Sequence, residues 1–152
     1  MSSIEVNGGN VVYEILGDSG DLIVLTPGGR FSKEIPGLRP LAEALVAGGY
    51  RVLLWDRPNC GASDVQFYGQ SESHMRAETL HGLLGALGVQ RCIIAGGSGG
   101  ARDSGACAHI PPSNAWSGRR SAPRPGRPIA CVDTGREGEK GGRTCRRQSP
   151  WR

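Results

Sequence analysis

The 152-residue sequence lacks the marks of several protein classes, and each absence narrows what the chain can be. No apolar run approaches the roughly 20 residues that a membrane-spanning helix needs, and the first residues carry no secretory signal pattern. The five cysteines are odd in number and contain no Cys-x-x-Cys pair, which argues against a zinc site and a disulfide framework. We therefore expect a cytoplasmic protein with no membrane partner and no metal.

Large apolar residues are also missing from one part of the chain. Residues 103–152 contain no Leu, Phe, Met or Tyr, whereas residues 1–102 contain all twelve leucines. The same fifty residues hold ten of the eighteen Lys and Arg residues and six of the ten prolines, so their formal charge is +6. Such a segment cannot bury enough apolar surface to offset about 1–2 kcal/mol of backbone entropy per residue. We expect a folded domain over residues 1–102 and a disordered Arg/Gly/Pro-rich tail over residues 103–152.

Short apolar runs alternate with helical patterns in residues 1–102. Two β-prone runs, Ile4–Val6 and Val11–Ile15, flank an Asn-Gly turn and predict a hairpin. Continuous apolar runs predict strands buried on both faces, at residues 22–25, 51–55 and 92–95. Leucines at helical spacing predict helices between these strands, one from about residue 38 to 47 and one from about residue 73 to 88. The pattern predicts an α/β sheet, parallel in its centre, with an amino-terminal hairpin.

The third of these runs leads into Gly96-Gly97-Ser98-Gly99-Gly100, which has the spacing Gly-x-Ser-x-Gly. A strand-to-helix turn with this spacing holds a serine hydroxyl in a tight, strained bend. Glycine is required on both sides because a Cβ there would collide with the neighbouring backbone. The motif therefore predicts an exposed, reactive serine at position 98.

Two further motifs end predicted strands, and the three together resemble the amino-terminal half of an α/β-hydrolase. Pro27-Gly28-Gly29 stands where the family usually has His-Gly-x, and residues 56–63 resemble the family's Asp-x-x-Gly-x-Gly-x-Ser turn, with Asn59 in a glycine position. Gly96–Gly100 resembles the nucleophile elbow. The resemblance covers about residues 4–102. It implies an incomplete α/β-hydrolase sheet.

By this resemblance Ser98 is the catalytic nucleophile, and the backbone amides of Gly29 and Gly99 form the oxyanion hole. The implied reaction is acyl transfer from a small-molecule, ester-like substrate, with no metal and no organic cofactor. Relatives resembling proline iminopeptidases or cofactor-free haloperoxidases stay open. Serine at this position argues against haloalkane dehalogenase or epoxide hydrolase chemistry, for which the resembling families use an aspartate.

The family orders its triad as serine, acid and histidine, and the sequence offers no such partners on later strands. His109 is the only histidine after Ser98, and only Asp103 stands between them among the acids. The strand at residues 92–95 would also form an open edge. We therefore expect a truncated hydrolase with little or no turnover. A reading-frame change shortly after Arg102 would produce this pattern, and so would alternative splicing.

Other residues of interest have structural or binding interpretations. We expect Asp56 and Ser63 to fix a turn, with the carboxylate accepting backbone amides. Arg30 and Arg102 flank the predicted catalytic loops and are expected to face solvent, to form ion pairs or to meet an acidic substrate. Two alternatives to an esterase remain: a non-catalytic fragment, and a nucleic-acid-binding protein that uses the basic tail, which is the weaker hypothesis.

Overall fold

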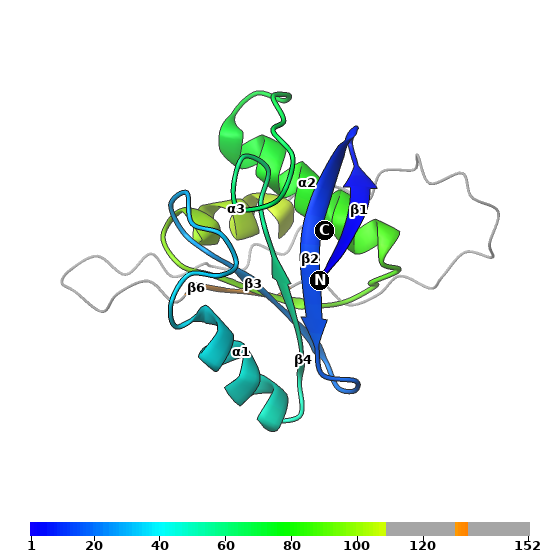
Figure 1. The fold of residues 1–152 in the computed structure, drawn as a ribbon, viewed down its shortest axis with the longest axis vertical. Helices are drawn as coiled ribbons and strands as arrows, with labels where there is room; N and C mark the ends of the chain where they lie inside the picture. Colours follow the sequence, from blue (N-terminus) through cyan, green and yellow to red (C-terminus); the bar gives the residue numbers. More distant parts are fainter. Residues whose placement is uncertain (109–129, 134–152) are drawn as a thin grey trace, which may run out of the picture.

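The fold is built around a mixed sheet with the strand order β1-β2-β4-β3-β5-β6 (Figure 1). The computed structural model describes residues 1–108 and 130–133, which form six strands and three helices. In chain order the elements are β1 (Ser2–Val6), β2 (Gly9–Leu16), β3 (Leu22–Thr26), α1 (Leu38–Ala47), β4 (Arg51–Trp55), α2 (Glu72–Ala86), β5 (Ile93–Gly96), α3 (Gly99–Ala108) and β6 (Ala130–Asp133). The predicted α/β fold class is confirmed.

β1 and β2 form the predicted antiparallel hairpin, and the turn between them accounts for its register. Asn7 and Gly8 adopt positive φ angles of 52° and 82°, as the two central residues of a type I′ turn do. This turn pairs Val6 with Gly9 and carries the ladder back along the whole of β1. β2 then runs antiparallel to β4, so the hairpin closes one side of the sheet.

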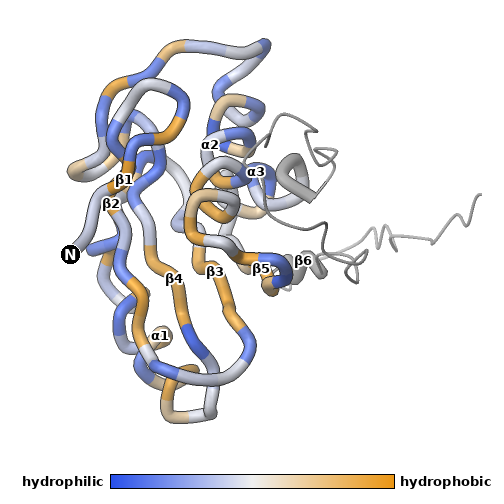
Figure 2. The backbone as a smooth tube through the Cα atoms, turned by 90° about the vertical axis from the view of Figure 1, so that its right-hand side faces the viewer, coloured by the Kyte–Doolittle hydropathy of each residue, from blue (hydrophilic) through white to orange (hydrophobic). Residues whose placement is uncertain are grey.

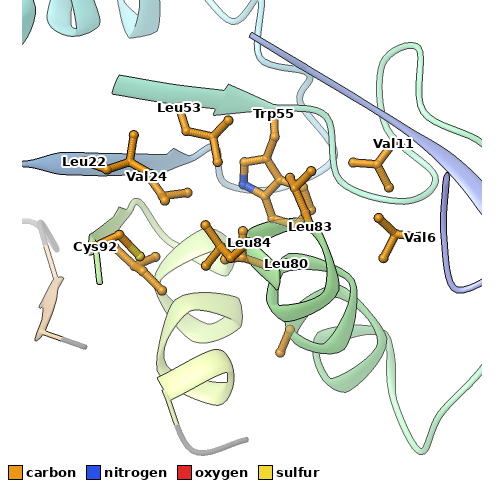
Figure 3. Close-up of a cluster of buried hydrophobic side chains, with 12 residues drawn as sticks. Val6, Val11, Leu22, Val24, Leu53, Trp55, Leu80, Leu83, Leu84 and Cys92 are labelled. Carbon is orange, nitrogen blue, oxygen red and sulfur yellow. The ribbon is translucent and has the colours of Figure 1, made fainter. Parts of the chain in front are cut away.

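The central strands β3, β4 and β5 run parallel, and helices cover both faces of the sheet. α1 packs on one face, against a cluster that includes Ile23 and Leu25. α2 covers the other face, where Leu22, Val24 and Trp55 join a larger cluster (Figure 3). Successive side chains of a strand point to opposite faces, so a strand covered on both sides requires an unbroken apolar run. Figure 2 shows this run as an apolar band along β3 and β4.

Helices α1 and α2 begin and end close to the residues that the sequence pattern indicates. α1 ends at Ala47 with Gly48 as its C-cap, and the following Gly49 has a φ of 87° that favours glycine. α2 begins after Ser71, whose hydroxyl accepts a hydrogen bond from the His74 backbone N–H at 3.2 Å. Among the described residues, no helix is both long enough and apolar enough to cross a membrane.

Two elements lie beyond the domain boundary that we predicted at residue 102. α3 continues to Ala108, and β6 pairs in parallel with β5, from Ile93 opposite Ala130 to Gly96 opposite Asp133. The expectation of an open edge at this strand was wrong, because β6 supplies the ladder partners. These four residues were not predicted as a strand because they stand within basic, proline-rich sequence. Otherwise the predicted tail lies outside the described residues, so its disorder stays a prediction.

Candidate active site

The loops that follow β3, β4 and β5 lie at one edge of the sheet. Parallel strands bring their carboxyl ends to the same edge, which is where open α/β sheets bind their ligands. All three motifs that the sequence singles out lie in these loops or at their borders, at residues 27–29, 56–63 and 96–100. This edge is therefore the candidate site.

The turn from β5 into α3 is tight, and two of its glycines leave no room for a side chain. A Cβ added to Gly96 would lie 2.5 Å from the carbonyl carbon of Gly100, and one added to Gly100 would lie 2.3 Å from the Thr26 carbonyl oxygen. Between them, Ser98 has a φ of 53° and is exposed. Left-handed backbone is uncommon outside glycine, so this geometry agrees with the strained bend that the sequence predicts.

The loop after β3 comes close to this turn. A Cβ added to Gly28 would lie 2.6 Å from the Gly97 carbonyl oxygen and 3.1 Å from the Ser98 Cβ. A Cβ added to Gly99 would lie 3.5 Å from the backbone nitrogen of Gly29. The structure thus brings together Ser98, Gly29 and Gly99, the three residues that the sequence analysis assigned to the site.

The turn after β4 has the expected structural role. The Asp56 carboxylate accepts hydrogen bonds from the backbone N–H groups of Lys33 at 2.6 Å and Ala62 at 3.0 Å. The Ser63 hydroxyl donates to the Asp56 carbonyl at 2.7 Å and accepts from the Val12 backbone N–H at 2.8 Å. These bonds tie the turn to β2 and to the loop after β3.

Asn59 occupies a position where the resembling family has glycine, and its backbone explains the preference. Its φ is 65°, which asparagine tolerates better than most residues. Its side-chain amide donates to the Gln66 carbonyl at 3.0 Å, and its side-chain oxygen accepts from the Gln66 backbone N–H at 2.8 Å. The substitution therefore keeps the turn and adds a local bridge.

The loop after β3 also carries a buried cation. The Lys33 side chain is almost fully buried, and its ammonium group donates a hydrogen bond to the Glu34 carboxylate. That hydrogen bond lowers the pKa of Glu34 below its ordinary value, and the charge of Lys33 acts in the same direction. The Glu34 carboxylate is therefore charged at neutral pH.

Sequence reasoning missed Arg57, whose side chain is fully buried beneath the site. Its Nη1 donates to Asp103 Oδ2 at 3.0 Å, and its Nη2 donates to the carbonyl oxygens of Gly28 at 3.1 Å and Gly29 at 2.7 Å. Asp103, the single acid between Ser98 and His109, is thus engaged by an arginine. An arginine two positions after a buried strand was the one available signal.

A second buried arginine extends this group of charges. Arg76 on α2 lies 3.9 Å from Asp103 Oδ2, and it forms a 2.6 Å ion pair with Glu72 one helical turn earlier. Its Nη2 also lies 3.7 Å from the Cys60 Sγ. The result is a connected set of polar groups that reaches from the loop after β3 to α2 and α3.

The described residues bring no catalytic base to the serine. Among the described residues, no side chain forms a hydrogen bond with the Ser98 hydroxyl, and His109 lies outside them. Arg30 and Arg102 are both exposed, and the described part of the chain offers no ion-pair partner to Arg30. Within those same residues, no group of His, Cys, Asp or Glu side chains could hold a metal ion.

A cavity of about 640 Å³ opens between the loop after β3 and the start of α2. Arg30 lines it, together with the exposed side chains of Val65 and Phe67, which are 69% and 87% accessible. A smaller cavity of about 300 Å³ lies between α1 and the ends of β3 and β5, where Gly28 and Gly96 line it. The larger cavity joins apolar surface to the Arg30 side chain, and the Glu72 carboxylate in its lining is paired with Arg76.

Comparisons with known proteins agree with this architecture, although no family model matches the chain. A 2-hydroxy-6-oxononadienedioate/2-hydroxy-6-oxononatrienedioate hydrolase of Pseudomonas putida is 34% identical over 100 residues, which are 60% of this chain and 32% of that protein. A 2-hydroxy-6-oxo-6-phenylhexa-2,4-dienoate hydrolase of Comamonas testosteroni is 33% identical over 92 residues, 58% of this chain and 31% of that protein. The chain spans about a third of the length of these curated relatives.

Solved structures give the same result. Epoxide hydrolase A from Mycobacterium thermoresistibile superposes with a TM-score of 0.59 at 27% identity, covering 70% of this chain and 34% of its own. An α/β-hydrolase from Sphaerobacter thermophilus superposes with a TM-score of 0.59 at 28% identity, covering 70% of this chain and 39% of its own. The sheet, its tight serine turn and these likenesses define the class: the described fold is part of an α/β-hydrolase. The proteins that it resembles in sequence are hydrolases of small molecules.

Proposed function

We propose that this chain carries the nucleophile and oxyanion hole of a serine hydrolase that works by acyl transfer. Ser98 would be the nucleophile, and the backbone amides of Gly29 and Gly99 would bind the developing oxyanion. One observation carries the proposal: an exposed serine with left-handed backbone lies in a turn that the loop after β3 approaches closely, with the Gly29 nitrogen 3.5 Å from where a Cβ on Gly99 would lie.

The chemistry follows from these positions. The Ser98 oxygen attacks the substrate carbonyl, and its proton passes to a base. The carbonyl oxygen becomes an anion, which amide N–H groups stabilise in a site that they already face. The C–O bond to the leaving group then breaks, the leaving alcohol takes up the proton, and an acyl-serine remains. Water repeats the sequence to release the acid and restore the serine.

A serine hydroxyl is a weak nucleophile without a neighbouring base. The described residues bring no side chain into hydrogen-bond contact with Ser98, so we propose that the chain alone shows little or no turnover. In this proposal, a base supplied from outside raises the reactivity of Ser98 without changing the site.

Two observations bear on the substrate class. Arg30 and the apolar rim of the larger cavity favour a small, ester-like molecule that also carries an anionic group. The names of the relatives describe organic acids, among them a dienedioate, which agrees with a cation beside the site. The alternative of a nucleic-acid-binding tail concerns residues outside the described part, and no contact of the described residues favours it.

The proposal is tested by labelling the full chain with a fluorophosphonate probe, with and without added imidazole, and locating the adduct by peptide mass spectrometry. We expect slow labelling at Ser98, acceleration by imidazole, and loss of the adduct in Ser98→Ala. Ser19→Ala removes another exposed serine and should label like the parent chain. Equal labelling of Ser98→Ala, or no adduct at any imidazole concentration, would leave a non-catalytic fragment as the better account.

A further inference from the structure

Arg57 is fully buried, has no role in the resemblance-based assignments, and contacts the loop after β3 and helix α3. We propose that Arg57 is a positioning residue, which holds the loop after β3 so that the Gly29 amide points into the site beside Gly99. This inference rests on the proposed function, because it gives Arg57 a role in building the oxyanion hole. Arg57 itself does not touch the substrate.

The geometry of the peptide bond connects Arg57 to the Gly29 amide. In a planar trans peptide, the C=O of one residue and the N–H of the next point in opposite directions. Arg57 Nη2 donates a hydrogen bond to the Gly28 carbonyl at 3.1 Å, so this oxygen points toward the buried guanidinium. The Gly29 N–H on the same peptide plane then points in the opposite direction, away from the guanidinium. The same nitrogen holds the Gly29 carbonyl at 2.7 Å and so fixes the next peptide plane as well. The guanidinium therefore sets the direction of the donor that the reaction needs.

The other end of the guanidinium is anchored to the second donor's helix. Asp103 follows Gly99 by four residues on α3, which places the two on the same side of the helix. The 3.0 Å bond from Arg57 Nη1 to Asp103 Oδ2 thus joins the loop that carries Gly29 to the helix that begins at Gly99. The planar fork of arginine can hold both partners at once, whereas the single ammonium of lysine cannot.

The buried ion pair between Arg57 and Asp103 is not an efficient way to stabilise the fold. Burying two charges costs free energy, and replacing a buried ion pair by apolar groups often leaves stability unchanged or higher. Among the described residues, Arg57 Nε and Asp103 Oδ1 find no hydrogen-bond partner, which adds to that cost. The contacts that Arg57 does make all serve one loop and one helix of the site.

The first test measures the loop directly. Backbone ¹⁵N relaxation of the full chain should give Gly29 and Arg30 order parameters near the rigid value of about 0.85, falling below about 0.6 in Arg57→Lys. The double variant Arg57→Met with Asp103→Leu should show the same loss while keeping the thermal midpoint, because it leaves no buried charge unpaired. Order parameters in β4 should not change in either variant.

The second test measures reactivity. Imidazole-assisted labelling of Ser98 should slow by about 100-fold in Arg57→Lys and in the double variant, the size expected when one donor is displaced. Arg39→Met removes an arginine that pairs with Glu14 on the surface, and it should leave both the loop and the labelling rate unchanged.

The two tests separate this inference from the proposed function. If the parent chain is never labelled but the loop loosens in the Arg57 variants, the hydrolase proposal fails and the positioning role stands. If labelling is Ser98-dependent but neither the loop nor the rate responds to Arg57, the positioning role is wrong. Loosening that spreads equally through β4 would also overturn it, since a general loss of packing would then explain the result.

Discussion

The two faces of the sheet and the edge that carries the candidate site are held together by different forces. On the faces, fully buried side chains such as Trp55, Leu80 and Leu83 pack without regard to direction. At the edge, the buried groups include Asp56, Arg57 and Asp103, and each is defined by hydrogen bonds to a specific partner. Apolar packing thus fixes which strands and helices form, while directional bonds fix where the loops lie.

One bond crosses between the two regions. The Trp55 indole N–H donates to the Thr26 hydroxyl at 3.1 Å, at the ends of β4 and β3. Trp55 belongs to the apolar cluster by its ring and to the edge by its nitrogen, so the two regions meet at this side chain. Substitutions on the apolar faces and substitutions at the edge can therefore each test the difference between the two regions.

The largest effect is expected on the apolar face. Leu80→Ala should lower the free energy of unfolding by about 2–5 kcal/mol, because Leu80 is fully buried against β3 and β4 and its loss leaves a cavity. Leu41→Ala is the matched control on α1, where the side chain is 48% accessible, and should cost below about 1 kcal/mol. Urea denaturation measures both. Equal costs would mean that the face is not the main source of stability.

A smaller loss of stability, which depends on the exact position substituted, is expected at the edge. Gly100→Ala should destabilise by about 3 kcal/mol, because the new Cβ would meet the carbonyl oxygens of Thr26 and Pro27. Gly97→Ala changes the neighbouring part of the same turn, where a Cβ meets nothing within 4 Å. That variant should be neutral or up to about 1 kcal/mol more stable. Thermal unfolding of both variants measures the difference. A similar loss of stability in each would contradict the close packing of this turn.

The smallest effect concerns a partly exposed ion pair, the counterpart of the buried pair between Arg57 and Asp103. Arg39 on α1 forms a 2.6 Å bond with Glu14 on β2, and this hydrogen bond lowers the pKa of Glu14 from its ordinary value of 4.5. A lowered pKa in the folded state means that the stabilisation exists above the unfolded pKa and disappears as the pH falls through the folded one. Glu14→Gln should therefore reduce the thermal midpoint by at most about 3 °C at pH 7.

The pH dependence is what distinguishes this pair. The difference between the parent chain and Glu14→Gln should shrink as the pH drops below 4.5 and vanish once Glu14 is protonated in both states. Glu5→Gln removes an exposed carboxylate that forms no ion pair among the described residues, and should show no such trend. A midpoint difference that persists at low pH would assign the effect to packing instead.

Strands β1 to β5, with their hairpin, and helices α1 and α2 could be predicted because each depends on local signals. An Asn-Gly turn, unbroken apolar runs and leucines at helical spacing specify their own conformation within a few residues. The positions of Ser98, Gly29 and Gly99 followed from motifs at strand ends, since parallel strands bring those ends together. Their proximity needed no knowledge of side-chain packing.

The buried polar network could not be predicted, because its partners are distant in sequence. Arg57 reaches Asp103 across 46 residues and Gly28 across 29, and no local pattern marks such a pair. β6 was missed for the opposite reason: its four residues are too few to stand out from a basic, proline-rich surrounding. Long-range hydrogen bonds and short edge strands are visible only once the fold is known.

The backbone of Ser98 also restricts which amino acid can supply a hydroxyl at this position. Threonine carries the same functional group, but its second branch at Cβ makes a φ of 53° a true outlier for it. The backbone of this turn therefore accepts the primary alcohol of serine and disfavours the secondary alcohol of threonine. The main chain itself restricts which hydroxyl-bearing residue can stand at position 98.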